Sequence, residues 1–239
     1  MNISSDSTLQ KTGVETLPIF SITPFTLLDF PDKTACILWF AGCNMRCGYC
    51  YNPEIVKGKG KLGLADVLVF LKKRKGLLDG VVLSGGECTL HPGIIEFARE
   101  IKALGMQIKL DTNGSRPEVL AKMMSQKMLD YVALDFKSLP GSFQKITRSS
   151  FFDQFEKSLK LLLTNNIPME VRTTVHSSQI NAEELFEMKN FLVSRGYKGK
   201  YYLQHFVNQT MTLEDLGPSK KPQVDQSIIA SEPQFVWRN

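Results

Sequence analysis

The sequence predicts an α/β protein built as an open barrel of six strand–helix units. The first observation is an alternation between short apolar runs rich in β-branched residues and longer segments with helical period. The second is that several helical segments begin at proline or asparagine and end before glycine. Strands joined by single helices are expected to run parallel, and right-handed crossovers curl such a sheet. Six units are too few to close an eight-stranded barrel.

The first part of this pattern supplies two strands and two helices. Thr34–Phe40 and Gly80–Ser84 are short apolar runs without alternation, as expected for strands buried on both faces. Leu64–Lys75 has helical period. Pro92–Leu104 is predicted as a helix because proline suits its first turn and Gly105 ends it.

The same cycle repeats through the middle of the chain. Met106–Leu110, Tyr131–Phe136 and Met169–Val175 are predicted as strands from their apolar, β-branched composition. Pro117–Gln126, again opened by proline, and Phe152–Thr164 are the helices between them.

The last unit is a capped helix followed by a strand. Asn181 is the expected N-cap of a helix to Arg195, because Glu184 stands at the capping-box position and Gly196 follows the last turn. Lys200–Phe206 is the sixth strand. Periodicity alone also permits a doubly wound parallel sheet, which is the competing topology.

These elements divide the chain into three parts. Residues 1–17 are polar and rich in serine and threonine, so we expect a flexible lead-in rather than a targeting segment. Residues 18–210 form the barrel. Residues 211–239 have turn formers and little periodicity, and we expect an irregular tail that packs on the barrel through Phe235–Trp237.

Composition predicts a soluble, reduced, cytoplasmic protein. No apolar run approaches the length of a membrane span, and five cysteines are an odd number in a chain of 239 residues. The net charge is only +5 and no nucleic-acid motif accompanies it, so no nucleic-acid partner is expected. The basic residues between Lys57 and Lys75 are predicted to form a solvated helix face, with docking of a partner as the alternative.

A group of three cysteines carries the strongest functional signal in the chain. Cys43, Cys47 and Cys50 have the spacing C-x3-C-x2-C in the loop after the first strand. Three thiolates this close together can ligate three irons of a cubane cluster, whereas a closed electron-transfer site takes four. Because the next cysteine is Cys88, the spacing predicts a [4Fe–4S] cluster with one iron open to another ligand.

Structural zinc is the alternative for these cysteines. Zinc sites use four protein ligands, commonly in paired knuckles, and the second knuckle is missing here. His91 and Cys88 would have to complete such a site. In this case the chain would be a zinc-binding interaction module that docks partners through the basic residues between Lys57 and Lys75.

Glycines and polar residues follow the later strands at their carboxyl ends, where parallel α/β folds bind ligands. Gly85 and Gly86 allow main-chain groups to approach a ligand, and Glu87 adds a carboxylate that can pair with an ammonium group. Lys137 and Arg172 offer positive charge for a ligand carboxylate. The other polar residues at these ends include Asp111, Thr112, Asn113, Asp135 and His205.

Four motifs occur in order along the chain: C-x3-C-x-aromatic-C with Tyr49, G-G-E from Gly85, D-T-N-G from Asp111, and D-x-K ending at Lys137. Together they resemble the radical S-adenosylmethionine (radical SAM) enzymes. From about Pro18 to His205 the chain looks like the anaerobic ribonucleoside-triphosphate reductase activating proteins, which belong with the pyruvate formate-lyase activating enzymes. The resemblance implies the partial (β/α)6 barrel of the radical SAM type.

The resemblance also implies roles for individual residues. Cys43, Cys47 and Cys50 would ligate the [4Fe–4S] cluster, and Glu87 would meet the methionine ammonium of S-adenosylmethionine. The residues expected to line this cofactor are Tyr49, Gly85, Gly86, Asp111, Asn113, Lys137, Arg172 and His205. A monovalent cation would be held by Asp111, Thr112 and Asp135.

The implied activity is reductive cleavage of S-adenosylmethionine to a 5′-deoxyadenosyl radical, which generates a glycyl radical on a partner enzyme. The expected partner is anaerobic ribonucleotide reductase, with flavodoxin or ferredoxin as a low-potential electron donor. A radical SAM enzyme acting on a deazapurine or nucleoside is the enzymatic alternative. Two positions depart from the family pattern, namely Tyr51 in place of histidine and Cys88 in place of proline.

Overall fold

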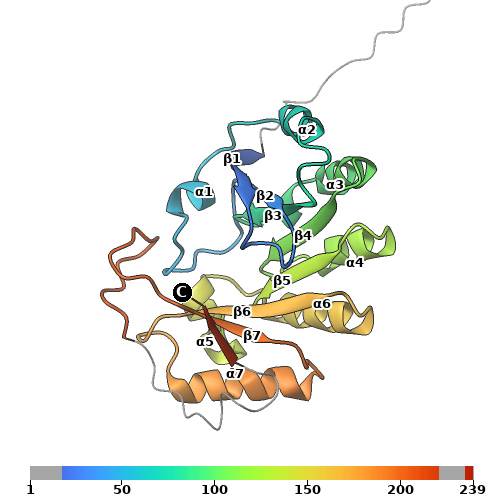
Figure 1. Cartoon of the computed structure of the whole chain (residues 1–239). Coiled ribbons are helices and arrows are strands. Elements are labelled where there is room, and N and C mark those ends of the chain that lie inside the picture. Colours follow the sequence, from blue (N-terminus) through green and yellow to red (C-terminus); the bar gives the residue numbers. More distant parts are fainter. Residues whose placement is uncertain (1–17, 221–234, 239) are drawn as a thin grey trace, which may run out of the picture.

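One sheet of eight strands forms the centre of the computed structural model, which describes residues 18–220 and 235–238. The strands lie side by side in sequence order, with β1 and β8 at the two edges (Figure 1). All six predicted strands are present and pair in parallel with one another. They are β2 (Ala35–Phe40), β3 (Gly80–Gly85), β4 (Gln107–Thr112), β5 (Tyr131–Asp135), β6 (Met169–Val175) and β7 (Tyr201–His205). The predicted α/β class is therefore confirmed.

The two edge strands were not predicted. β1 (Ile19–Thr26) pairs antiparallel with β2, and β8 (Phe235–Arg238) pairs parallel with β7. The end of the expected irregular tail is therefore a strand, too short for its periodicity to be recognised. Arg238 stabilises it through two hydrogen bonds of 3.1 Å to the buried carboxylate of Glu170. The predicted lead-in, residues 1–17, lies outside the described residues.

The five predicted helices are also present. They are α2 (Leu64–Lys72), α3 (Ile94–Ala103), α4 (Pro117–Ser125), α6 (Phe152–Thr164) and α7 (Ala182–Ser194). At the start of α7 the expected capping box is formed, because the Asn181 side chain accepts from Glu184 N and the Glu184 side chain accepts from Asn181 N, both at 2.9 Å. None of the helices in the described part of the chain combines the length and apolarity that crossing a bilayer requires.

Short helical segments occupy three of the loops, where no helix was expected. They are α1 (Pro53–Lys57), the 3₁₀ turn η1 (Cys88–Leu90) and α5 (Pro140–Thr147). Both α1 and α5 begin at proline, whose fixed φ suits the first helical position. Their brevity explains why hydrophobic periodicity does not reveal them.

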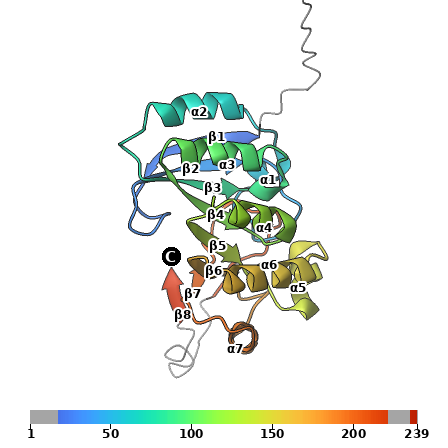
Figure 2. The ribbon, with the colours of Figure 1, turned by 90° about the vertical axis from the view of Figure 1, so that its right-hand side faces the viewer.

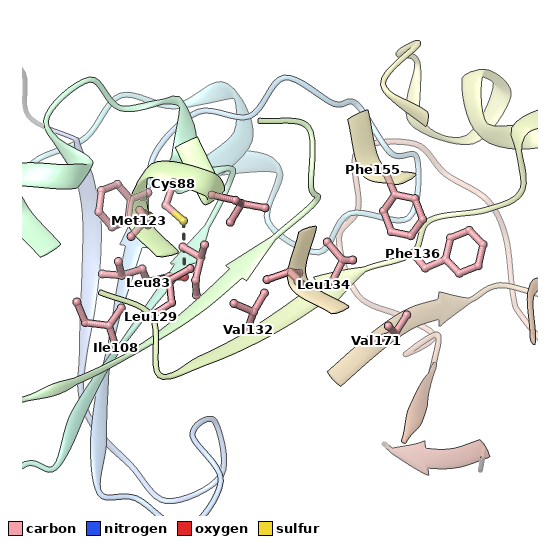
Figure 3. Close-up of a cluster of buried hydrophobic side chains, with 14 of the residues drawn as sticks. Leu83, Cys88, Ile108, Met123, Leu129, Val132, Leu134, Phe136, Phe155 and Val171 are labelled. Atoms are coloured by element: carbon pink, nitrogen blue, oxygen red, sulfur yellow. Dashed lines mark hydrogen bonds between the residues drawn. The ribbon is translucent and has the colours of Figure 1, made fainter. Parts of the chain in front are cut away.

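The two faces of the sheet have different surroundings, because successive residues of a strand point to opposite sides. Helices α2, α3, α4 and α6 follow the curve of the sheet on its convex side (Figure 2). Side chains such as Leu83, Leu134 and Val171 fill the space between (Figure 3). Phe136 stacks on Phe155 of α6, with ring centroids 4.9 Å apart. The other face is the concave one, and it carries the polar strand residues.

Candidate active site

A cavity of about 290 Å³ opens at the carboxyl ends of the parallel strands. As the sequence predicts, these ends meet at one place, because every strand from β2 to β7 runs in the same direction. Twelve of the fourteen predicted site residues lie in its lining, whereas Glu87 and His205 do not. The twelve are Cys43, Cys47, Tyr49, Cys50, Gly85, Gly86, Asp111, Thr112, Asn113, Asp135, Lys137 and Arg172.

The cysteine loop brings its three thiols to the cavity. Cys47 is buried and Cys43 and Cys50 are half-buried, all as free thiols. Burial raises the pKa of Cys43 to about 12 and also raises the pKa of Cys47. The protein environment alone therefore favours neutral thiols. An iron centre bound to the sulfurs would remove this penalty, because metal coordination deprotonates a thiol.

The surroundings of these thiols fit a bulky bound group. Tyr49 is buried, and its hydroxyl has no hydrogen-bond partner among the described residues. A buried hydroxyl without a partner is costly unless a ligand or water completes it. Lys137 Nζ lies 5.9 Å from the centroid of the Tyr49 ring and brings positive charge to the same wall. The three sulfur donors and this unpaired hydroxyl are therefore available to the predicted cluster and its ligand.

The two residues that could complete a zinc site point elsewhere. His91 Nε2 lies 3.1 Å from Ala41 O, and its ring packs against Phe40. Cys88 is fully buried and its sulfur lies 3.7 Å from the main-chain oxygen of Leu83 (Figure 3). In the part of the chain that the structure describes, no group of three or more His, Cys, Asp or Glu side chains is arranged to hold a single metal ion. The geometry therefore gives the zinc alternative no fourth ligand.

The glycine motif lies directly against the cysteine loop. Gly86 N donates to Phe40 O at 2.8 Å, and Glu87 N donates to Gly42 O at 2.9 Å. A Cβ atom at Gly86 would collide with the carbonyl oxygen of Gly42. Gly85 has φ of +113°, a conformation that side chains rarely permit. Both glycines are therefore needed for the two loops to approach each other.

Replacing Gly86 by alanine is expected to push the cysteine loop out of place. The collision is with main chain, which cannot move as a side chain would, so we expect a loss of about 2 kcal/mol in the free energy of unfolding. The iron content after anaerobic reconstitution should also fall severalfold. Urea unfolding and iron analysis measure both effects. Gly141→Ala is the matched control, because its Cβ would meet no atom within 4 Å; an equal effect there would contradict this account.

Four charged side chains lie in one wall of the cavity, and a fifth, Lys109, is buried directly behind them. Asp111 lies 2.5 Å from Lys109 Nζ and 3.3 Å from Arg172 Nη1. Asp135 lies 2.9 Å from Arg172 Nε and 3.1 Å from Lys137 Nζ. Three cations and two anions give the group one net positive charge. Such a wall favours a ligand that carries a carboxylate.

Mutual attraction keeps these groups ionised despite their burial. Burial alone would raise the pKa of Asp111, but Arg172 and Lys109 outweigh it and lower the pKa to about 2. In Asp135, Arg172 and Lys137 likewise overcome burial and lower the pKa. Burial would lower the pKa of Lys137, and the Asp135 carboxylate reverses this shift. At neutral pH Asp111, Asp135 and Lys137 are therefore charged.

These contacts also occupy the residues expected to hold a monovalent cation. Each oxygen of Asp111 and of Asp135 already accepts from a lysine or from Arg172. The Thr112 hydroxyl donates to Glu87 at 2.9 Å. Arg172 thus supplies positive charge between the two carboxylates, and the cation at Asp111, Thr112 and Asp135 stays a prediction that these contacts do not support.

Glu87 is fully buried and lies outside the lining of the cavity. Its carboxylate accepts from Thr89 N at 3.2 Å, the Thr89 hydroxyl at 2.5 Å, the Thr112 hydroxyl at 2.9 Å and Asn113 N at 2.7 Å. Burial raises its pKa in spite of these bonds. The expected contact of Glu87 with a ligand ammonium stays a prediction that these contacts do not support, because the four hydrogen bonds use the carboxylate to join the ends of β3 and β4.

His205 also lies away from the cavity. Its ring stacks on Trp237 of β8, with centroids 4.0 Å apart and planes 6° from parallel. Gln204, the residue before it, lines the cavity. Since neighbouring strand residues point to opposite faces, only one of the two can face a ligand. The expected ligand contact of His205 stays a prediction that this placement does not support, and Gln204 is the β7 residue in the lining.

Sequence reasoning missed two other members of the site. Lys109 is buried behind Asp111 and pairs with it, and Asn44 in the cysteine loop accepts a hydrogen bond from Asn113 Nδ2 at 3.0 Å. Lys109 stands two residues before Asp111 in one strand, so period-two reasoning would have placed both on one face. No local pattern points to the contact of Asn44, which joins residues far apart in sequence.

Residues 207–220, here called the strap, lie against the cysteine loop. The Tyr51 hydroxyl accepts from Val207 N at 2.7 Å, and the Tyr51 ring stacks on Phe206. Glu214 N donates to Gly48 O at 3.0 Å, and the Glu214 carboxylate pairs with Arg148 at 3.0 Å. The strap therefore covers the side of the loop that carries the last cysteine.

Tyr51→Phe is expected to weaken the strap while keeping the ring contact. The variant removes the acceptor for Val207 N, and the loss of one such hydrogen bond costs about 1 kcal/mol. Urea unfolding of the protein without metal measures this change. Tyr51→Ala should cost more, because the contact with Phe206 is lost as well. Equal stabilities of Tyr51→Phe and the unmodified protein would show that the strap does not depend on this bond.

Comparison with known proteins identifies relatives over most of the chain. Residues 37–192 match the family model of the Radical SAM superfamily. A Methanocaldococcus jannaschii protein whose name assigns it as a glycyl-radical enzyme activating enzyme is 31% identical over 228 residues, covering 88% of this chain and 95% of that protein. The pyruvate formate-lyase-activating enzyme of Clostridium pasteurianum is 28% identical over 177 residues, covering 70% of this chain and 71% of that protein.

Solved structures share the fold. The crystal structure of Streptococcus suis SuiB bound to S-adenosylmethionine superposes with a TM-score of 0.62 at 16% identity, covering 85% of this chain and 52% of that one. The chain spans about half the length of the solved structures that it matches first. At this identity the likeness concerns the fold alone, and it confirms the predicted partial barrel.

Proposed function

Because the chain belongs to the radical SAM superfamily, we propose that it is a glycyl-radical enzyme activase whose partner is an anaerobic ribonucleoside-triphosphate reductase. Its cofactors are a [4Fe–4S] cluster and S-adenosylmethionine, as membership of the family implies. When bound, these cofactors supply one-electron chemistry that ends in removal of a hydrogen atom from the substrate. A low-potential protein such as flavodoxin or ferredoxin would deliver the electron.

One observation carries this proposal: the three cysteines line the same cavity as the glycine motif and the charged wall. In that cavity Cys43, Cys47 and Cys50 would hold the cluster through their sulfurs. The other residues that we assign to the cofactor are Tyr49, Gly85, Gly86, Asp111, Asn113, Lys137, Arg172 and Gln204.

Each group of residues has a physical task. Gly85 and Gly86 let main-chain groups come close to the ligand. Lys137 and Arg172 give the wall its excess of positive charge, which attracts and orients the carboxylate of S-adenosylmethionine. The strap covers the cysteine loop from outside and limits the access of water.

A protein substrate is supported by a pair of exposed apolar side chains next to the lining of the cavity. Asp29, in the turn between β1 and β2, lines the cavity, and next to it Leu28 is 92% exposed and Leu27 is 63% exposed. Adjacent exposed apolar side chains are common where a protein surface binds another protein. The names of the relatives in Methanocaldococcus and Clostridium support a glycyl-radical enzyme as that protein.

The test combines the anaerobically reconstituted protein with S-adenosylmethionine, a chemical reductant and candidate partners. We expect the electron paramagnetic resonance doublet of a glycyl radical on anaerobic ribonucleotide reductase and none on a partner whose radical glycine is replaced by alanine. Cofactor cleavage that a nucleoside stimulates, without a radical on any partner, would favour the small-molecule alternative. A colourless protein that holds zinc and leaves S-adenosylmethionine intact would overturn the proposal.

A further inference from the structure

Asn113, in the turn after β4, connects a buried carboxylate to the cysteine loop. Its main-chain N donates to Glu87 Oε2 at 2.7 Å. Its side-chain Nδ2 donates to Asn44 Oδ1 at 3.0 Å and lies 3.9 Å from Cys43 Sγ. The residue is only 5% exposed, so water does not compete for these contacts. A single residue thus joins the glycine motif, through its main chain, to the first cysteine of the loop, through its side chain.

The orientation of this amide follows from its partners. Asn113 Oδ1 accepts from Ser115 N at 2.9 Å, and a main-chain N–H can only donate. The oxygen must therefore face Ser115, which leaves the NH₂ group facing Cys43. Asn44 Nδ2 donates to the Ser115 hydroxyl at 2.8 Å and closes the network. Neither amide can flip without losing hydrogen bonds.

Cys43 has a second N–H donor close by. Met45 N lies 3.4 Å from Cys43 Sγ, within the loop itself. The main-chain contact depends only on the loop, whereas the contact from Asn113 depends on the turn after β4. Hydrogen bonds to the sulfurs of an iron–sulfur cluster stabilise its reduced, more negative state and so raise the reduction potential.

Glu87 keeps the turn in place for this contact. Its two oxygens accept one bond each from Asn113 N and the Thr112 hydroxyl, and two further bonds tie the carboxylate to Thr89. Its full burial leaves no room for the carboxylate to turn towards solvent. Loss of this acceptor would free the turn and move the Asn113 amide.

We propose that Asn113 is a positioning residue whose side-chain amide donates to the sulfur of Cys43, that Glu87 holds it there, and that this pair raises the reduction potential of the cluster. The inference rests on the proposed function, since it requires that Cys43 ligates the cluster. In this inference Glu87 does not contact S-adenosylmethionine. It holds Asn113 in place and so influences the reduction potential of the cluster.

The test is the midpoint potential of the reconstituted cluster, measured by redox titration with electron paramagnetic resonance detection and without S-adenosylmethionine. Asn113→Ala should shift the midpoint to lower potential at unchanged iron content. Asn165→Ala is the control for removal of an asparagine amide, because Asn165 is exposed at the end of α6 and its Nδ2 donates to Leu161 O. An unshifted midpoint in Asn113→Ala, or an equal shift in Asn165→Ala, would overturn the inference.

Glu87→Gln tests the second residue without changing its size. It places an NH₂ group against groups that donate hydrogen bonds to the native carboxylate. The midpoint potential should therefore shift in the same direction as in Asn113→Ala. An unchanged midpoint in this variant would remove Glu87 from the inference. Circular dichroism of the variant before reconstitution separates this shift from unfolding.

A second measurement tests the inference even if the variants fail to bind the cluster. In the unmodified sequence with ¹⁵N only in asparagine side chains, pulsed electron paramagnetic resonance should detect nitrogen coupling to the reduced cluster. No coupling would overturn the inference whatever the variants do. If the unmodified protein binds no cluster at all, the proposed function fails first. A cluster that cleaves S-adenosylmethionine and yet shows no coupling would leave the function standing and reject only the role of Asn113.

Discussion

Cys47→Ala is expected to abolish both cluster assembly and cleavage of S-adenosylmethionine. Cys47 is the most buried of the three loop cysteines, and without it two sulfurs would have to hold a cubane that needs three. Cys88 cannot replace it, because its sulfur is directed at the main-chain oxygens of Leu83 and Asp111. Iron and sulfide analysis after anaerobic reconstitution, together with the yield of 5′-deoxyadenosine, measures the loss.

The control for this prediction is Cys36→Ala. Cys36 is also a completely buried free thiol, but it lies within β2 and packs in the core rather than in the loop. Its replacement should cost about 1 kcal/mol of stability and leave the iron content unchanged. Normal iron content in Cys47→Ala, or an equal loss in Cys36→Ala, would show that the loop cysteines are not the cluster ligands.

Arg172→Gln is expected to have the second largest effect, because one guanidinium pairs with two carboxylates. The variant leaves Asp111 and Asp135 with one lysine each and removes the net positive charge of the wall. Breaking a buried ion pair by removing one partner costs about 3 kcal/mol. The affinity for S-adenosylmethionine should also fall by about tenfold or more, equivalent to about 1.4 kcal/mol. Urea unfolding and equilibrium dialysis measure the two effects.

The stability difference should depend on pH in a defined direction. With Arg172 present, the pKa of Asp111 is about 2, below its usual value of 3.8, so its contribution to stability is complete above about pH 4. This contribution is lost as the pH falls from 4 towards 2, because the carboxylate takes up a proton. The difference in the free energy of unfolding between Arg172→Gln and the unmodified protein should therefore be largest near pH 7 and should decrease below pH 4.

An exposed ion pair provides the comparison for Arg172. Arg148 pairs with Glu214 at 3.0 Å, but their side chains are 54% and 40% exposed. Arg148→Gln should cost less than about 1 kcal/mol, because solvent screens such pairs. An equal loss in the free energy of unfolding for the two variants would contradict the electrostatic account of the wall. So would a loss for Arg172→Gln that stays constant down to pH 2.5.

Most of the fold was predictable because its signals are local. The strands β2 to β7 are apolar runs and the long helices have clear period and caps, so each element can be recognised within its own residues. β1 and β8 were missed for opposite reasons. β1 carries mixed polar and apolar residues at the edge of the sheet, and β8 has four residues and depends on Arg238 reaching Glu170.

The side of a strand on which a residue lies was harder to predict than its position at a strand end. Gln204 and His205 are neighbours in sequence, yet one lines the cavity and the other stacks on Trp237. Glu87 follows two glycines that reach the cavity, yet its carboxylate turns into the interior between β3 and β4. Motif and spacing identify such residues as a group, and the direction of each depends on register and packing.

The sequence by itself determined the spacing of the three cysteines, the absence of a fourth cysteine beside them and the order of the strand ends around the cavity. These follow from spacing within a loop and from parallel connections, which are properties of neighbouring residues. The tertiary structure alone decided that Arg172 joins Asp111 to Asp135, that Asn113 faces Cys43, and that the strap covers Tyr51. Each of these contacts joins segments far apart in the chain, so it arises only once the sheet has curved and brought its strand ends together.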